Sequence, residues 1–93
     1  MELQIGRVTH YYNHLHVAVL QLTSVLKIGD KIHVTGHATD FTEHVASMQV
    51  DHHAVERVKA GDDVAIKVIE PVHPHAIVYR VTEEILAPYS YEQ

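Results

Sequence analysis

Histidine is the residue type with the most chemical potential in this sequence, with ten rings in 93 residues. Two pairs have members two positions apart, His14 with His16 and His73 with His75. On a β-strand this spacing directs both rings of a pair to one face. Imidazole binds zinc, nickel or copper, so these four residues are candidate ligands of a divalent metal. The simpler interpretation is solvated surface histidines, because no His-Glu-x-x-His motif and no cysteine accompanies them.

The charge balance of the chain is acidic. Seven Lys and Arg against twelve Asp and Glu give a formal net charge of −5 with neutral histidine. Protonation of all ten histidines would reverse the sign of this charge, which makes a pH-responsive domain an alternative function. Nonspecific phosphate binding needs clustered basic residues, so no binding to DNA is expected.

Catalytic signatures are weak. Asp30, Asp62 and Asp63 lie in predicted turns, where aspartate commonly caps backbone amides. Ser24 and Ser47 have no nucleophile motif around them. The sequence therefore predicts a protein that is not an enzyme and needs no cofactor, with the divalent metal as the one open exception.

A repeated Gly-Asp turn organises the elements that would position these residues. Residues 26–34 contain an apolar approach, a Gly-Asp step and an alternating strand, and residues 58–66 repeat this pattern. Residues 71–79 form a fainter third copy, in which His75-Ala76 replaces Gly-Asp. Turn-then-strand units without helices between them favour a small closed β structure.

Six strands at even spacing are expected from the alternation of apolar residues. They cover residues 2–10, 15–22, 31–35, 41–52, 63–69 and 77–82. The alternation changes phase at Gly6, which predicts a β-bulge. Residues 36–40 are expected to form a loop, and residues 53–59 have a competing interpretation as one helical turn.

His10 and His52 are each expected on the same strand face as nearby apolar residues, because the positions are separated by an even number. We expect each ring to be partly buried and bonded to a backbone carbonyl, with a binding-site role as the alternative. Tyr79 is expected in the core. Tyr11 and Tyr12 are candidates either for stacking on a ligand or for a structural role.

One domain is expected, with residues 1–84 as its body and residues 85–93 as a tail. The N-terminal residues show no export signal, and no apolar run approaches the length of a membrane span. Together with the absence of cysteine, this predicts a cytoplasmic protein without membrane contact.

An ordered series of short motifs resembles a known family. The series is Ile5-Gly6-Arg7-Val8-Thr9-His10-Tyr11-Tyr12, Val17-Ala18-Val19, residues 26–32, Gly36, Thr39-Asp40-Phe41, Ser47-Met48-Gln49, Val55-Glu56, Gly61-Asp62 and Val78-Tyr79. It is similar to small bacterial and archaeal translation elongation factor-like proteins, which resemble the β-barrel domain II of elongation factor Tu. A similar barrel occurs at the C-terminus of some collagenase-like peptidases. The resemblance covers residues 4–82.

This resemblance implies an all-β fold, namely a closed six-stranded β-barrel of the translation-protein type. It also implies a non-catalytic binding module that contacts RNA or a translation-related protein. GTP binding of the P-loop kind is excluded because the Gly-x4-Gly-Lys-Ser/Thr motif is absent. The residues expected to contact a partner are Arg7, His10, Tyr11, Tyr12 and His52. The alternatives are a histidine-rich metal-binding or pH-responsive domain, and an accessory interaction domain for a peptidase-like partner; the sequence does not indicate an oligomeric state.

Overall fold

The computed structural model describes residues 1–82, and in this part of the chain every regular element is a β-strand. No helix in residues 1–82 has the length and apolar character of a membrane span. The predicted tail, residues 85–93, lies outside the described residues. The strands are β1 (Glu2–Tyr12), β2 (Val17–Leu22), β3 (Leu26–Lys27), β4 (Lys31–Gly36), β5 (Thr39–His44), β6 (Met48–Val50), β7 (His53–Val55), β8 (Arg57–Val58), β9 (Asp63–Lys67) and β10 (Ile77–Val81).

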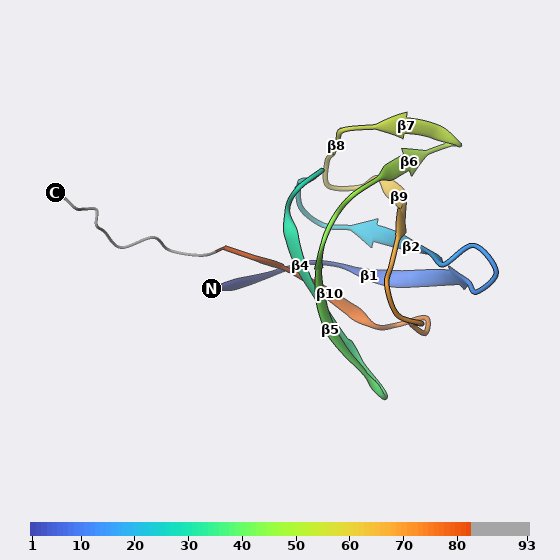
Figure 1. The fold of residues 1–93 in the computed structure, drawn as a ribbon. Coiled ribbons are helices and arrows are strands. Elements are labelled where there is room, and N and C mark those ends of the chain that lie inside the picture. The colour runs from blue at the N-terminus through green and yellow to red at the C-terminus, as the bar shows by residue number, and fades with distance from the viewer. Residues whose placement is uncertain (83–93) are drawn as a thin grey trace, which may run out of the picture.

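Eight of the strands form one antiparallel sheet in the order β5-β4-β10-β1-β2-β9-β6-β7, and β3 pairs with β8 in a second sheet (Figure 1). The all-β class is therefore confirmed. The closed six-stranded barrel is not confirmed, because β5 and β7 end the sheet without pairing to each other. The two ends of the described chain meet, since the Thr82 N–H donates to the Met1 carbonyl at 2.8 Å.

Strand β1 contains two bulges, of which the sequence predicted one. Its register with β10 shifts between Gln4 and Gly6, as expected from the phase change. A Cβ on Gly6 would collide with a backbone carbonyl oxygen of β2, so this position requires glycine. The second shift, relative to β2, lies between Val8 and His10. It turns His10 to the exposed outer face, so the predicted partial burial of this ring is wrong.

The predicted fourth strand, residues 41–52, is two shorter strands, β5 and β6. The chain leaves the sheet at Val45, whose side chain is buried and whose N–H donates to the Asp30 carbonyl at 2.9 Å. The expected loop 36–40 also extends too far, because β5 begins at Thr39. Residues 53–59 form β7 and β8 rather than a helical turn. His52 is exposed in the β6–β7 turn, which corrects the prediction of a partly buried ring.

Three turns share one geometry, and they are the three copies of the sequence repeat: residues 27–30, 59–62 and 73–76. In each, the fourth residue donates its N–H to the carbonyl of the first, at 3.1, 3.1 and 3.2 Å. The third residue has a positive φ, 93° at both glycines and 78° at His75. A type II turn requires this feature of its third residue. Strands β4, β9 and β10 begin directly after the three turns.

Each turn is anchored on a buried aliphatic residue: Val45, Leu22 or Val8, respectively. The N–H of the third turn residue donates to the carbonyl of this anchor at 2.8, 2.9 and 2.8 Å. The anchor returns a bond from its own N–H to the carbonyl of the fourth turn residue, at 2.9, 3.1 and 2.8 Å. The third copy therefore keeps the backbone geometry of the repeat although it has lost glycine and aspartate.

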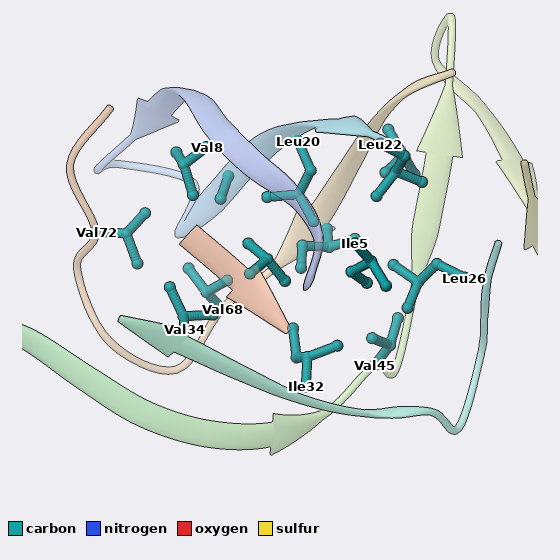
Figure 2. Packing of buried hydrophobic residues seen from close by; sticks show 14 of the residues in the cluster. Ile5, Val8, Leu20, Leu22, Leu26, Ile32, Val34, Val45, Val68 and Val72 are labelled. Carbon is teal, nitrogen blue, oxygen red and sulfur yellow. The ribbon is translucent and has the colours of Figure 1, made fainter. Parts of the chain in front are cut away.

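The buried hydrophobic side chains form one core cluster, and Figure 2 shows the labelled members enclosed by the surrounding strands. The cluster contains Ile5, Val8, Ala18, Leu20, Leu22, Leu26, Ile32, Val34, Phe41, Val45, Met48, Val58, Val64, Ile66, Val68, Val72, Ala76 and Val78. The predicted inward faces of β4 and β9 are confirmed. Tyr79 is not a core residue, because its neighbour Val78 points inward and leaves the tyrosine on the outer face, with its ring centroid 6.2 Å from that of His33.

Candidate partner-binding surface

A mainly apolar hollow of about 480 Å³ lies on the outer face of the sheet, and we call it the outer-face hollow. Its lining residues are Tyr12, Leu15, Val17, Val19, Gln49, Asp51, His52, Asp63 and Ala65. Strand pairing gathers them, because Ala65 of β9 is opposite both Val19 of β2 and Gln49 of β6. The ends of the β1–β2 and β6–β7 hairpins close the hollow, and Figure 1 shows both hairpins pointing away from the N-terminus.

Two large apolar side chains of this hollow are open to solvent. Tyr12 is 50% exposed and Leu15 is 61% exposed. Asp51 and Asp63 add carboxylates to the lining, and His52 adds an imidazole. An exposed apolar patch with a polar rim is typical of a surface that contacts another molecule. The carboxylates favour a ligand with positive rather than negative charge.

The β6–β7 hairpin presents its two turn residues to the hollow in an unusual backbone conformation. Asp51 and His52 have φ values of 52° and 65°. Positive φ at both central positions is the geometry of a type I′ hairpin turn, for which Asn-Gly is the favoured sequence. Aspartate suits the first of these positions, whereas histidine replaces the glycine that is favoured at the second.

The residues predicted to contact a partner are only partly brought together. Tyr12 and His52 line the outer-face hollow, and the His10 ring centroid lies 6.2 Å from that of Tyr12. Arg7 is farther along β1, where its Nη2 donates to the Gln21 Oε1 at 3.3 Å. Tyr11 is half-buried and packs against the core.

The four candidate metal ligands are all exposed. His14 and His16 lie in the β1–β2 connection, whereas His73 and His75 belong to the third anchored turn. Within residues 1–82, no three side chains of His, Cys, Asp or Glu are grouped to hold a metal ion. The spacing of two does not direct these pairs to a strand face, because none of the four residues is in a strand.

Sequence reasoning missed a second cavity, of about 560 Å³, which we call the basic cavity. It is lined by Val25, Lys27, Gly29, Asp30, Lys31, His44, Arg57, Arg80, Val81 and Thr82. Four of the seven Lys and Arg residues of the chain are in this set. The only sequence signal is the pair of lysines that flanks the first Gly-Asp turn; the arginines come from distant strands.

Sequence reasoning also missed an imidazole that is hydrogen-bonded to two carboxylates. The Nδ1 of His33 is 2.8 Å from the Glu2 Oε2, and its Nε2 is 2.6 Å from the Asp40 Oδ1. Because carboxylates only accept hydrogen bonds, a ring that donates to both is an imidazolium. The bond to Asp40 raises the pKa of His33 most, burial opposes it, and Glu2 raises it further. This contact joins β1, β4 and β5.

Burial raises the pKa of the Glu43 carboxyl, and a bond from the Ile69 backbone N–H partly offsets this effect. The N–H donates to the Glu43 Oε1 at 2.8 Å and so connects β5 with the segment after β9. This carboxylate lines neither the outer-face hollow nor the basic cavity.

Comparison with known proteins finds that no protein-family profile matches the chain. A protein of Methanocaldococcus jannaschii described as an uncharacterized protease is 39% identical over 85 residues. The matched region is 90% of this chain but 21% of that protein, so the chain spans about a fifth of the length of this relative.

Solved structures show the same fold. One structure of the C-terminal domain of a putative U32 peptidase from Geobacillus thermoleovorans has a TM-score of 0.80 at 18% identity, covering 85% of this chain and 92% of that one. The selenomethionine variant of that domain has a TM-score of 0.78 at 19% identity, covering 82% of this chain and 96% of that one. These similarities support the peptidase side of the sequence resemblance and give no support to the elongation-factor side.

Proposed function

We propose that this chain is a non-catalytic accessory domain that docks on a peptidase-like catalytic partner through the outer-face hollow. The observation that carries the proposal is the similarity to the Methanocaldococcus protein, which is described as a protease. The region that is 39% identical to this chain makes up only 21% of that protein. The structural neighbours are likewise C-terminal domains of a larger putative peptidase.

The chemistry of the outer-face hollow supports a protein rather than a nucleic acid as its partner. Tyr12 and Leu15 offer exposed apolar area, which contributes to affinity when it is removed from water. Asp51 and Asp63 would repel phosphates, and the formal net charge of −5 acts in the same direction. The partner surface should therefore present an apolar side chain flanked by Lys or Arg.

A titration with a defined partner tests the proposal. The partner is the Methanocaldococcus protein from which the 85-residue matched region has been removed, and calorimetry measures its binding to this chain. We expect saturable binding that is weakened at least about tenfold by Leu15→Asp, because this change places a charge on the apolar wall. The matched control is Ile69→Asp, since Ile69 is also an exposed aliphatic residue (68%) and lies outside the hollow.

Three results would overturn this function. The first is the absence of saturable binding, and the second is an equal loss of affinity in the Leu15 and Ile69 variants. The third is hydrolysis of peptide substrates by this chain alone, which a non-catalytic domain cannot perform.

A further inference from the structure

The basic cavity concentrates positive charge in an acidic protein. Lys27, Lys31, Arg57 and Arg80 line it together with His44, although the chain has a formal net charge of −5. We propose that this cavity binds the carboxylate groups of an acidic peptide segment. The site is separate from the outer-face hollow, with which it shares no lining residue, and the inference does not depend on the proposed function.

Like charges face each other across the β3–β8 strand pair that borders the cavity, where Lys27 of β3 is directly opposite Arg57 of β8. Cations directly opposite each other on antiparallel strands are destabilising. A bound anion would remove this repulsion, so the arrangement favours a negatively charged ligand.

Arg80 supplies a guanidinium at the wall of the cavity. It is half-buried, and its Nη1 donates to the Val25 carbonyl, which holds the planar group in place. A guanidinium has five N–H donors in a fork that matches a carboxylate or phosphate. Asp30 is the only acid among the described lining residues, and its Oδ2 already accepts the Lys27 backbone N–H at 2.9 Å.

The distribution of charge selects among anions. A long nucleic acid would extend beyond the cavity over a surface that is acidic overall, where its phosphates are repelled. A short peptide can place one or two carboxylates near Lys27, Arg57 and Arg80 while the rest of it carries no charge. The aliphatic side chains of Val25 and Val81 in the same wall can contact its neutral part.

The experiment follows binding of a fluorescent hexapeptide with two central glutamates to the full chain, by anisotropy at low and high salt. The same peptide with glutamines is the ligand control, and a single-stranded oligonucleotide is the competing polyanion. Arg57→Gln is the test variant, because Arg57 is exposed and we expect the fold to tolerate its replacement. Lys67→Gln removes one positive charge from an exposed position outside the cavity and is the matched protein control.

We expect saturable binding of the glutamate peptide that weakens with salt, falls at least about tenfold in Arg57→Gln and is unchanged in Lys67→Gln. Without ligand, Arg57→Gln should raise the urea midpoint, because the repulsion with Lys27 is removed. The inference is overturned if the glutamine peptide binds equally, if both variants lose affinity equally, if no peptide binds, or if the oligonucleotide binds more tightly than the glutamate peptide.

Discussion

His75 donates its backbone N–H to the Val8 carbonyl at 2.8 Å, and Val8 returns a bond of 2.8 Å to the carbonyl of Ala76. A matching pair of backbone hydrogen bonds anchors each of the two Gly-Asp turns on another buried aliphatic residue. The turn geometry of the repeat thus persists where its sequence has changed. The change leaves a histidine at a φ of 78°, a conformation that glycine adopts without steric cost.

Replacing His75 with glycine should therefore stabilise the protein by about 0.5 kcal/mol, the relief of left-handed strain minus the greater entropy of glycine in the unfolded chain. Gly29→Ala should have the opposite effect, a loss of about 1 kcal/mol. No atom lies within 4 Å of the Cβ position at Gly29, so this loss measures backbone conformation alone. Urea denaturation gives both values, and a destabilised His75→Gly variant would show that the ring has a structural contact there.

The His33 contact with Glu2 and Asp40 should make stability depend on pH. The folded-state pKa of His33 is raised above the ordinary value of 6.5. Between these two pKa values the folded protein therefore binds more protons than the unfolded chain. The stabilising contribution is complete below a pH of about 6.5 and is lost as the pH rises through the folded-state pKa. An NMR titration of the ring should give a midpoint above 6.5.

Asp40→Asn should lower that midpoint, because the bond to Asp40 is the largest cause of the shift. It should also reduce the free energy of unfolding near pH 6, by less than about 1 kcal/mol because Asp40 is exposed, and have little effect at pH 9. Glu70→Gln, at an exposed position, removes the same charge as a control. An equal loss of stability at both pH values would contradict the ionic role of His33.

His52→Gly should separate stability from binding. Glycine suits the φ of 65° at this position, so we expect the free energy of unfolding to rise by about 0.5–1 kcal/mol. The same change removes a ring from the lining of the outer-face hollow and should weaken binding of the truncated Methanocaldococcus partner several-fold. His14→Ala removes an exposed histidine outside the hollow and should not change that affinity. An unchanged affinity in His52→Gly would exclude the ring from the interface.

Alternation of apolar residues was sufficient to predict most strands and the inward faces of β4 and β9, because each of these strands has one buried face. It missed the bulge at Thr9, since threonine tolerates either face and no glycine marks the position. It also extended the fourth strand through Val45, because the bonds that turn the chain there come from Gly29 and Asp30, about 15 residues earlier.

The candidate sites depended more strongly on topology. Tyr12 and His52 were predicted separately, and only the pairing of β2, β9 and β6 brings their surroundings together. The basic cavity could not be predicted, because Lys27, Arg57 and Arg80 are far apart in the sequence and come from different strands. The charge composition does not indicate the basic cavity either, because a net charge of −5 gives no sign of a local cluster of cations.

The measurement that tests the docking surface most directly is an NMR map of this chain during titration with the truncated Methanocaldococcus protein. Docking through the outer-face hollow should change the amide signals around Tyr12, Leu15, Asp51 and His52, while those of the β4–β5 hairpin stay unchanged. Changes centred on another face, or no changes at a saturating concentration of the partner, would contradict it.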